Sequence, residues 1–376
     1  MNEIVKVFTG AEIHDGTHLH SGKVLALMQD GSRRILTPEE VPESTATEGL
    51  AAGVLCPGFI DLQVNGGGGV MFNDAPDVAT LRRVAEAHRA TGVAALLPTL
   101  ITDTPDKTEA AIEAAVSAIA EGVPGIIGLH LEGPHLSLAR KGAHDGALIR
   151  PMEAADLALI LRAATLLPNL MVTVAPENTS SAQISAMAEA GVIVSLGHSD
   201  ADYETCMAAF DAGACCVTHL FNAMSQMGNR APGLVGAALE RDGIRAGLIA
   251  DGIHVHPASI RNALAAKAAG IFLVSDAMAT AGSDITSFTL NGRVVFRAGG
   301  RLTLANGTLA GADLEMGRAV YTLTHAVGEP LETALARAIS GPLALLRDHI
   351  GLGRIENPDQ PLVLYDPESG TVRVLG

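Results

Sequence analysis

Short apolar runs alternate with alanine-rich segments of helical period through the central part of the chain, from about residue 57 to residue 276. Each run is bounded by glycine, proline or a charge, which is typical of a strand buried on both faces. The segments between the runs carry apolar residues at helical spacing, which predicts amphipathic helices. The predicted strands are 58–64, 93–98, 126–132, 171–176, 192–198, 214–219, 245–251 and 271–276. The predicted helices are 77–91, 105–121, 151–164, 181–190, 202–212, 257–269, 313–327 and 330–347.

This alternation predicts an α/β fold with a parallel sheet, and eight strands suit a closed TIM-like (β/α)8 barrel. Shorter β-like runs fill residues 1–55 and return after residue 286. We therefore expect a barrel inserted into a small β-sandwich module that both ends of the chain build together. The expected division is 1–55 for the N-terminal part of the module, 56–286 and 306–350 for the barrel, and 287–305 and 351–376 for the C-terminal part of the module.

Composition narrows the possible partners. The chain has 376 residues and a formal net charge of −16, which disfavours nucleic acid and anionic membranes, so a local positive patch must meet any anionic ligand. No apolar run reaches a membrane-spanning length, and the opening residues lack the pattern of a signal peptide, so we expect a cytoplasmic protein. The four cysteines show no CxxC spacing and are expected to be reduced core thiols.

In a barrel of this kind, the residues that end the strands share one functional face. Here they are mostly groups that bind metals or move protons: Gln63, Asn65, Glu132, His198, His219, the stretch Asp251 to His254, and Asp276. Burying an ionised carboxylate such as Glu132 costs several kcal/mol unless a cation or hydrogen-bond donors compensate it. We therefore ask which positive partner Glu132 meets.

Glu132, His198 and His219 supply a possible answer. Two imidazoles and a carboxylate suit a zinc-like ion that keeps one position open for water. Each residue alone is more simply an ordinary polar side chain at a strand end, but three in one barrel favour a metal site. Such an ion lowers the pKa of bound water, and Asp276 is the expected base that takes the proton and later returns it to the leaving group. The alternative for Asp276 is an N-cap.

Two further features are weaker signals. The run Asn65-Gly66-Gly67-Gly68-Gly69 lacks the Lys-Ser/Thr of a P-loop, so we expect a flexible loop at the mouth of the site without a cofactor. Arg230, His254, His256 and the pair Arg140-Lys141 can together form a patch that holds a phosphate or carboxylate. A single arginine in a loop is otherwise a solvated surface residue.

The chain resembles the amidohydrolase superfamily of metal-dependent barrel hydrolases in the run Pro57-Gly58-Phe59-Ile60-Asp61 and in the positions of His198, His219 and Asp276. Longer motifs are similar to those of one family within it, the N-acetylglucosamine-6-phosphate deacetylases. They are His130-Leu131-Glu132-Gly133-Pro134, Lys141-Gly142-Ala143-His144, Leu196-Gly197-His198-Ser199, Thr218-His219-Leu220-Phe221-Asn222-Ala223-Met224, Ala250-Asp251-Gly252-Ile253-His254-Val255 and Gly307-Thr308-Leu309-Ala310-Gly311.

This resemblance implies a deacetylase that converts N-acetyl-D-glucosamine 6-phosphate into D-glucosamine 6-phosphate and acetate. It implies that Glu132, His198 and His219 hold the metal, with Asp276 as general base and acid. The phosphate contacts that it implies are Asn222 and Ala223 through main-chain donors, Arg230 and His254, and the sugar or acetyl contacts are Ala143, His144, Leu309, Ala310 and Gly311. It also implies a homodimer in which Arg230 comes from the neighbouring subunit.

The metal count depends on the end of the first barrel strand. Many superfamily members carry His-x-His there for a second ion, whereas Gln63-Val64-Asn65 stands at this place in the chain. Amides are poor zinc ligands compared with imidazole, so we interpret Gln63 and Asn65 as a vestigial second-metal position. We expect one divalent ion per subunit, zinc first, with iron, cobalt or manganese as alternatives.

Two other functions stay open. The first is another amide hydrolase of the superfamily, such as an N-acyl-amino-acid deacylase or a cyclic amidase. The second is a barrel that serves as a non-catalytic scaffold. Another amide hydrolase would not need the pair of Arg230 and His254 that holds a phosphate. A scaffold would be expected to have lost metal ligands or the base, whereas all four candidates are present here.

Overall fold

Residues buried on both faces build the central sheet. All nine residues of β11 (Val93–Ile101) and all six of β8 (Phe59–Val64) are buried, as expected for parallel strands covered by helices. The computed structural model describes residues 3–50 and 52–375. The other strands of this sheet are β12 (Leu129–Glu132), β13 (Leu170–Val174), β14 (Ile193–Leu196), β15 (Cys216–Val217), β16 (Arg245–Leu248) and β17 (Ile271–Leu273). The order is β17-β16-β15-β14-β13-β12-β11-β8, and neighbouring strands are parallel.

The sheet curves until its two edges meet beside Asp276. The main-chain N–H of Asp276 donates to the carbonyl of Gln63 across 3.0 Å, and Val64 forms an isolated parallel bridge with Ala277. The expected (β/α)8 barrel and its eight strands are therefore confirmed. Because all eight strands run in one direction, their carboxyl ends open on one face.

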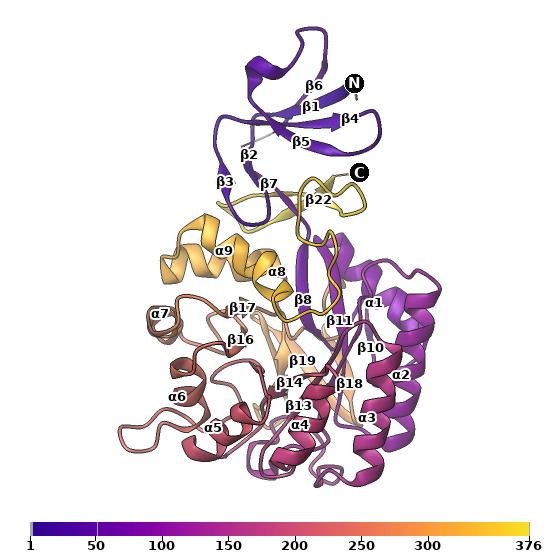
Figure 1. Cartoon of the computed structure of the whole chain (residues 1–376), viewed down its shortest axis with the longest axis vertical. Coiled ribbons are helices and arrows are strands. Elements are labelled where there is room, and N and C mark those ends of the chain that lie inside the picture. Colours follow the sequence, from indigo (N-terminus) through magenta and orange to yellow (C-terminus); the bar gives the residue numbers. More distant parts are fainter. Residues whose placement is uncertain (1–2, 51, 376) are drawn as a thin grey trace.

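Helices surround the barrel (Figure 1). They are α1 (Val78–Ala90), α2 (Pro105–Ala120), α3 (Ala154–Leu166), α4 (Ser181–Glu189), α5 (Tyr203–Asp211), α6 (Gly233–Glu240), α7 (Pro257–Ala266), α8 (Met316–Thr322), α9 (Leu331–Ala338) and α10 (Ser340–Leu343), with a π-helical turn at Leu323–Val327 and a 3-10 turn at Leu138–Arg140. A second 3-10 turn, Pro38–Glu40, lies between β5 (Arg33–Leu36) and β6 (Ala46–Gly49). No helix in residues 3–50 and 52–375 combines the length and apolarity needed to cross a membrane.

Two helices differ from the sequence-based expectation. The sequence pattern did not predict α6, because its residues from Gly233 to Leu239 are all buried and leave no polar face to mark a helical period. The predicted helix 330–347 is interrupted at Ile339 and forms the separate helices α9 and α10. The other predicted helices are present, with ends shifted by a few residues.

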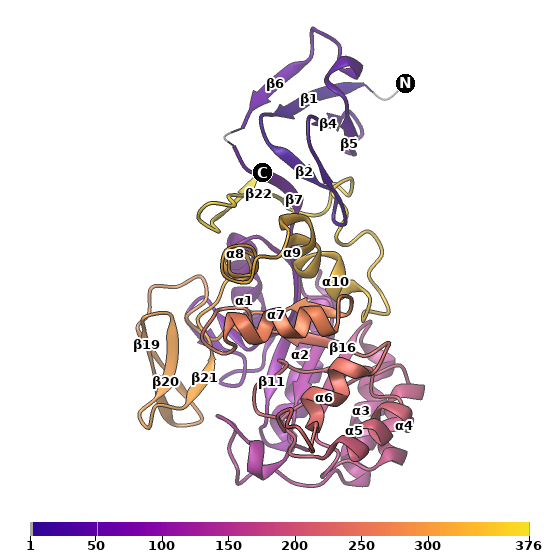
Figure 2. The ribbon, with the colours of Figure 1, turned by 90° about the vertical axis from the view of Figure 1, so that its left-hand side faces the viewer.

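Both ends of the chain meet in a β module above the barrel (Figures 1 and 2). One sheet has the order β5-β4-β1-β6 and the other has the order β23-β22-β7-β2-β3. Phe8, Leu25, Leu55 and Leu364 belong to one buried cluster of this module, so the N- and C-terminal segments share a core. The strands are β1 (Ile4–Thr9), β2 (Glu12–His14), β3 (Leu19–His20), β4 (Val24–Met28), β5 (Arg33–Leu36), β6 (Ala46–Gly49), β7 (Val54–Pro57), β22 (Leu362–Tyr365) and β23 (Val372–Leu375). Residues 1–2, 51 and 376 of the expected module lie outside the described residues.

The expected assignment of residues 287–305 to this module is corrected by the sheet pairing. β18 (Ser287–Leu290), β19 (Arg293–Ala298), β20 (Arg301–Leu304) and β21 (Leu309–Ala312) form a separate four-stranded sheet. This sheet packs on the barrel through Met71, Ile101 and Met278 and lies beside the barrel, away from the terminal module, in Figure 2. The strand pattern was right, but a strand pattern does not identify the surface on which the strands pack.

The glycine run after β8 is also more ordered than expected. It forms a short hairpin of β9 (Gly66–Gly67) and β10 (Val70–Met71). His88 hydrogen-bonds the Gly66 carbonyl across 2.9 Å, and the N–H groups of Gly68 and Gly69 donate to carbonyls of the loop after β17. A Cβ atom on Gly66 would lie 2.4 Å from the carbonyl oxygen of Val70, so glycine is required by close packing there.

Candidate active site

Glu132, His198 and His219 come together at the carboxyl ends of three barrel strands. Oε1 of Glu132 lies 3.2 Å from Nε2 of His198 and 3.1 Å from Nε2 of His219. The two imidazole Nε2 atoms are 3.1 Å apart, and all three side chains are buried. His198 and His219 have φ angles of 47° and 31°, a left-handed conformation that non-glycine residues adopt at a cost of about 1–3 kcal/mol. The backbone thus stores strain where the three ligand atoms converge.

The hydrogen bonds around this trio fit a dication. Nδ1 of His198 lies 2.8 Å from the carbonyl oxygen of Arg140, which can only accept, so in the neutral ring Nδ1 carries the proton and Nε2 presents a lone pair. The carboxylate adds a negative oxygen to the same point. Burial opposes the charge on Glu132, but when the two rings instead donate from Nε2, their hydrogen bonds outweigh burial and hold the pKa of Glu132 well below its usual value. Two imidazoles and one carboxylate form a donor set that is typical of a catalytic zinc site.

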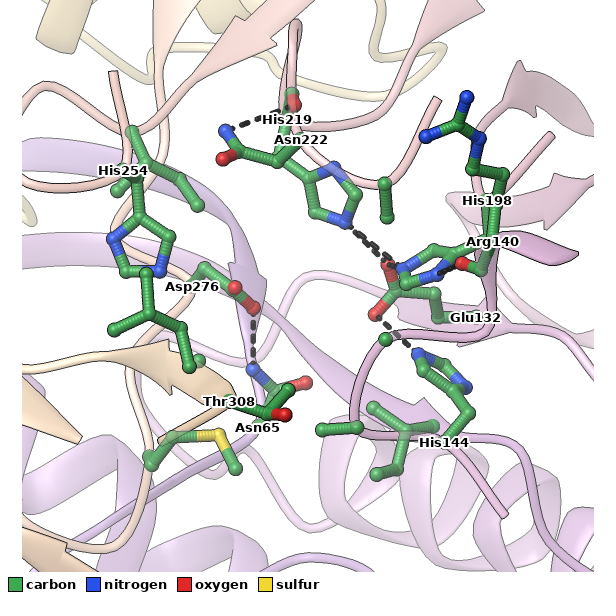
Figure 3. A pocket seen from close by; sticks show the side chains of 18 of the residues that line it. Asn65, Glu132, Arg140, His144, His198, His219, Asn222, His254, Asp276 and Thr308 are labelled. Atoms are coloured by element: carbon green, nitrogen blue, oxygen red, sulfur yellow. Dashed lines mark hydrogen bonds and ion pairs between the residues drawn. The ribbon is translucent and has the colours of Figure 1, made fainter. Parts of the chain in front are cut away.

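Asp276 faces this trio from the closing edge of the barrel (Figure 3). Its Oδ1 accepts from Nδ2 of Asn65 across 2.7 Å and from Nε2 of Gln63 across 3.2 Å. Nε2 of Gln63 also lies 3.2 Å from Oε1 of Glu132, so this amide bridges the two carboxylates. Burial, and then the charge of Glu132, raise the pKa of Asp276 to about 6. A carboxyl group with such a pKa can accept and release a proton near neutral pH.

His144 stands on the other side of Glu132. Its Nδ1 accepts from the main-chain N–H of Thr102 at 3.4 Å and lies 2.8 Å from the Thr102 hydroxyl, so the neutral ring carries its proton on Nε2. Nε2 lies 3.9 Å from Oε2 of Glu132, and the ring packs edge-on against His198 with centroids 4.4 Å apart. Burial, and then the charge of His198, lower the pKa of His144 to about 3. His144 therefore acts as a neutral hydrogen-bond donor.

His254 lies on the opposite side of the view in Figure 3. Its Nδ1 is 2.6 Å from Oδ2 of Asp251, whose Oδ1 accepts the main-chain N–H groups of Ile253 and His254 at 2.8 Å each. Burial raises the pKa of Asp251, but the hydrogen bond with His254 outweighs burial and holds this pKa below its usual value. Asp251 thus fixes the ring, so that Nε2 of His254 is left for a ligand.

These side chains line one cavity of about 380 Å³. The cavity has the size of a small-molecule site and combines titratable groups with apolar walls. Its lining includes these residues that the sequence analysis singled out: Asn65, Glu132, Arg140, Ala143, His144, His198, His219, Asn222, Ala223, His254, Asp276, Leu309 and Gly311. It also includes Ile101, Ala139, Ile249, Met278 and Leu290, which the sequence analysis did not name.

Several expected contacts lie outside the cavity wall. Gln63 sits behind the carboxylates, and Ala310 is buried in the core beneath the β18–β21 sheet. Arg230 is exposed and is not among the residues that line the cavity of its own chain. His256 caps α7 by accepting from the N–H of Ala258, so it serves the helix start. Arg140 does line the cavity, but its guanidinium pairs with Asp200 at 2.7 Å.

The turn after His219 offers fewer donors than expected. The main-chain N–H of Asn222 donates to the carbonyl of His219 across 2.9 Å, and the Asn222 side chain lies 3.3 Å from the carbonyls of His219 and Leu220. The main-chain N–H of Ala223, which has a φ of 49°, has no acceptor among the described residues. Ala223 is therefore the stronger main-chain donor for a ligand at this end of the cavity.

A model of the Amidohydrolase family matches residues 54–293, which is more than half of the chain. The chain belongs to the amidohydrolase family. Members of this family are metal-dependent, and the buried trio of Glu132, His198 and His219 has a donor set that can hold such an ion.

Three similar proteins narrow the comparison. The N-acetylgalactosamine-6-phosphate deacetylase of Shewanella sp. (strain ANA-3) is 44% identical over 299 residues, covering 79% of this chain and 75% of the relative. The N-acetylglucosamine-6-phosphate deacetylase of Haemophilus influenzae is 34% identical over 325 residues, covering 86% of this chain and 84% of the relative. The crystal structure of N-acetylglucosamine-6-phosphate deacetylase from Pasteurella multocida superposes with a TM-score of 0.90 and 36% identity, covering 98% of this chain and 96% of the other.

Proposed function

We propose that this chain hydrolyses the acetamide of N-acetyl-D-glucosamine 6-phosphate to D-glucosamine 6-phosphate and acetate. One observation carries the proposal: Glu132, His198, His219 and Asp276 share a cavity with His254 and Ala223, so that hydrolytic groups and anion-binding groups face the same space. The names of the Haemophilus influenzae and Pasteurella multocida relatives support this substrate.

The 4-epimer is a second candidate substrate. The Shewanella relative, at 44% identity, is named for N-acetylgalactosamine 6-phosphate. The two sugars differ only in the configuration of the hydroxyl group at C4, a carbon that carries neither the acetamide nor the phosphate. The same hydrolytic groups therefore serve both substrates, and the walls of the cavity decide between them.

We propose that Glu132, His198 and His219 hold one divalent ion, with zinc first and iron, cobalt or manganese as alternatives. The amides of Gln63 and Asn65 occupy the place of a second ion, and their donation to carboxylate oxygens supports a single-ion site. When bound, a dication would polarise the acetyl carbonyl and lower the pKa of a water molecule.

Asp276 would carry one proton from the attacking water to the leaving nitrogen, and His144 would donate a hydrogen bond to the acetyl oxygen. Oδ1 of Asp276 is held by the amides of Asn65 and Gln63, so Oδ2 is left to take a proton from the attacking water. Nε2–H of His144 would donate to the acetyl oxygen as negative charge develops there. Asp276 would then pass its proton to the sugar nitrogen, because an amide nitrogen leaves readily only as a neutral amine.

At the other end of the cavity, His254 and the N–H of Ala223 would bind the phosphate. Arg230 lies outside its own cavity, and we propose that it reaches the phosphate of a neighbouring subunit in a homodimer. Ala143, Leu309 and Gly311 would shape the sugar end, and Ala310 would support them from the core. Contacts remote from the scissile bond position the acetamide, so removal of the phosphate should lower kcat as well as raise KM.

Acetate release by the purified protein tests the proposal. The substrates to compare are N-acetylglucosamine 6-phosphate, N-acetylgalactosamine 6-phosphate, unphosphorylated N-acetylglucosamine and an N-acetyl amino acid, each with and without a chelator. We expect rapid, chelator-sensitive release from at least one phosphosugar and slow release from the others. Equal rates with and without phosphate would favour another amide hydrolase, and no release from any substrate would favour a scaffold.

A further inference from the structure

The β18–β19 hairpin reaches the wall of the active-site cavity. Leu290, the last residue of β18, is buried and lines the cavity. Arg293, its partner across the hairpin, donates from Nη2 to the main-chain carbonyl of Ala143. Ala143 also lines the cavity and directly precedes His144. One arginine thus connects a sheet outside the barrel to the loop that carries His144.

The hairpin is a firm support for this contact. Its turn residues Asn291 and Gly292 have φ angles of 49° and 73°, the left-handed pair that a tight two-residue turn of type I′ requires. The sheet is fixed to the barrel by Arg297, which donates from Nε to Asp313 across 2.8 Å and from Nη1 to the carbonyl of Ser283 across 2.7 Å. Arg293 therefore starts from an anchored strand.

The loop that receives the contact has less support of its own. Residues 141–145 contain no helix or strand, and Gly142 has a φ of 54°. Among the described residues its main chain makes two main-chain hydrogen bonds: the N–H of His144 donates to the carbonyl of Lys141 at 3.0 Å, and the carbonyl of Asp145 accepts from the N–H of Leu148 at 3.1 Å. Thr102 holds the His144 ring, but the main chain before that ring depends on the contact from Arg293.

Arg293 has no other partner that would explain its position. In the part of the chain that the structure describes, its guanidinium makes no ion pair, and its hydrogen bond to Ala143 is the only one. Arg293 is half-buried and has no carboxylate partner among the described residues. Its desolvation is offset by one main-chain carbonyl, and this carbonyl belongs to the active-site loop.

We propose that Arg293 is a positioning residue that holds residues 141–145 in place and so sets His144 against the acetamide. Nε2 of His144 is 3.9 Å from Glu132, so a small shift of the loop moves its proton away from the reacting oxygen. Misplacement by about 1 Å can cost on the order of 100-fold in rate. The kinetic part of this inference rests on the proposed deacetylation, whereas the structural part does not.

Kinetics of single and double variants test the kinetic part. Arg301 is a matched control, because it is an exposed arginine on the neighbouring strand β20 whose side chain makes no ion pair or hydrogen bond in residues 3–50 and 52–375. We expect Arg293→Ala to lower kcat about 10- to 100-fold with a smaller change in KM, Arg293→Lys to recover part of the loss, and Arg301→Ala to match the wild type.

A double-mutant cycle asks whether Arg293 acts through His144. If it does, Arg293→Ala adds little further loss in a His144→Ala background, because the group that it positions is already absent. Independent, additive losses would overturn the inference, as would an equal loss in Arg301→Ala. Metal content and Tm of each variant confirm that it is folded and loaded.

Hydrogen exchange of the full chain supplies a test that needs no substrate. Amides of residues 139–147 should exchange faster in Arg293→Ala than in the wild type and in Arg301→Ala, since the loop loses its anchor. Unchanged exchange would overturn the inference, even if the wild type is an active deacetylase. A wild type that releases no acetate would reject the proposed function, while faster exchange in the variant would still support the loop anchor.

Discussion

Asn65, just after the first barrel strand, donates its side-chain amide to Oδ1 of Asp276 across 2.7 Å. Gln63, two residues earlier, donates to both Asp276 and Glu132. These amides therefore separate two buried carboxylates whose charges repel each other. What looks in the sequence like the remnant of a second metal site is, in the structure, a pair of hydrogen-bond donors that orient the expected base.

Changing Asn65 should weaken catalysis without removing the metal. Asn65→Ala removes the donor, and we expect kcat to fall about tenfold because Asp276 loses its orientation. Asn65→Asp should cost more, because an acceptor with a like charge then faces Asp276. Steady-state kinetics together with metal analysis check this order. A kcat equal to that of the wild type in both variants would contradict it.

Asp276→Asn should abolish proton transfer. The amide keeps the shape of the side chain but cannot accept a proton, so we expect kcat to fall about 10²- to 10⁴-fold. The bound metal should remain at the wild-type level, since Asp276 is not one of the three expected ligands. Acetate release and elemental analysis of the same sample check both parts. Turnover that is unaffected would remove Asp276 from the mechanism.

Metal stoichiometry should be close to one divalent ion per chain. Glu132→Gln or His198→Ala should remove the ion and the activity together, because each takes away one of three ligands. Paired substitution of Gln63→His and Asn65→His should raise the content towards two ions, since imidazoles then stand at the second position. Two equivalents in the wild-type protein would refute the single-ion interpretation.

Stability should fall as pH rises through the range in which Asp61 ionises. Burial raises the pKa of Asp61 to about 7, and its Oδ2 has no hydrogen-bond partner among the described residues. The folded state therefore keeps a proton that the unfolded state releases near pH 4. Between about pH 4 and pH 7 the free energy of unfolding falls as a result, by roughly 1.4 kcal/mol per pH unit at most.

Asp61→Asn tests this pH dependence. The variant should flatten the fall in Tm relative to the wild type and be the more stable of the two at pH 8, when both are metal-free. The exposed carboxylate of Asp284 offers a control, since Asp284→Asn should leave the pH dependence unchanged. Parallel Tm curves for Asp61→Asn and the wild type would show that Asp61 does not gain a proton on folding.

The proposed role of Arg230 across a dimer interface predicts complementation between two inactive variants. Arg230→Ala keeps Asp276 in its own cavity, and Asp276→Asn keeps Arg230. Mixed dimers then contain one complete site, so subunit exchange should restore part of the activity. Activity that does not rise on mixing, in samples shown by mass analysis to exchange subunits, would place Arg230 outside the site.

The main residues of the candidate site could be predicted from the sequence because they stand at the ends of barrel strands. Glu132, His198, His219 and Asp276 are polar residues directly after apolar runs, and the barrel brings such residues to one face. Thr102 follows β11 in the same way and was missed only because threonine is unremarkable at a strand end. Their convergence follows from the topology, so the sequence pattern was sufficient to predict it.

Other features had no signal of their own in the sequence. Arg293 acts on a carbonyl at Ala143, and a main-chain partner leaves no trace in side-chain patterns. The first main-chain donor expected for the phosphate, at Asn222, is used inside its own turn. α6 is buried around its whole circumference, so the periodicity that identified the other helices was absent.

The terminal module has a consequence for the order of events during synthesis. β7 lies between β2 and β22 in its sheet, so it keeps one unpaired edge until the far end of the sequence arrives. The barrel can assemble on the ribosome before that time, while an open strand edge is a template for association with other chains. Truncated or stalled products that lack β22 should therefore aggregate through this edge even when their barrels are correctly folded.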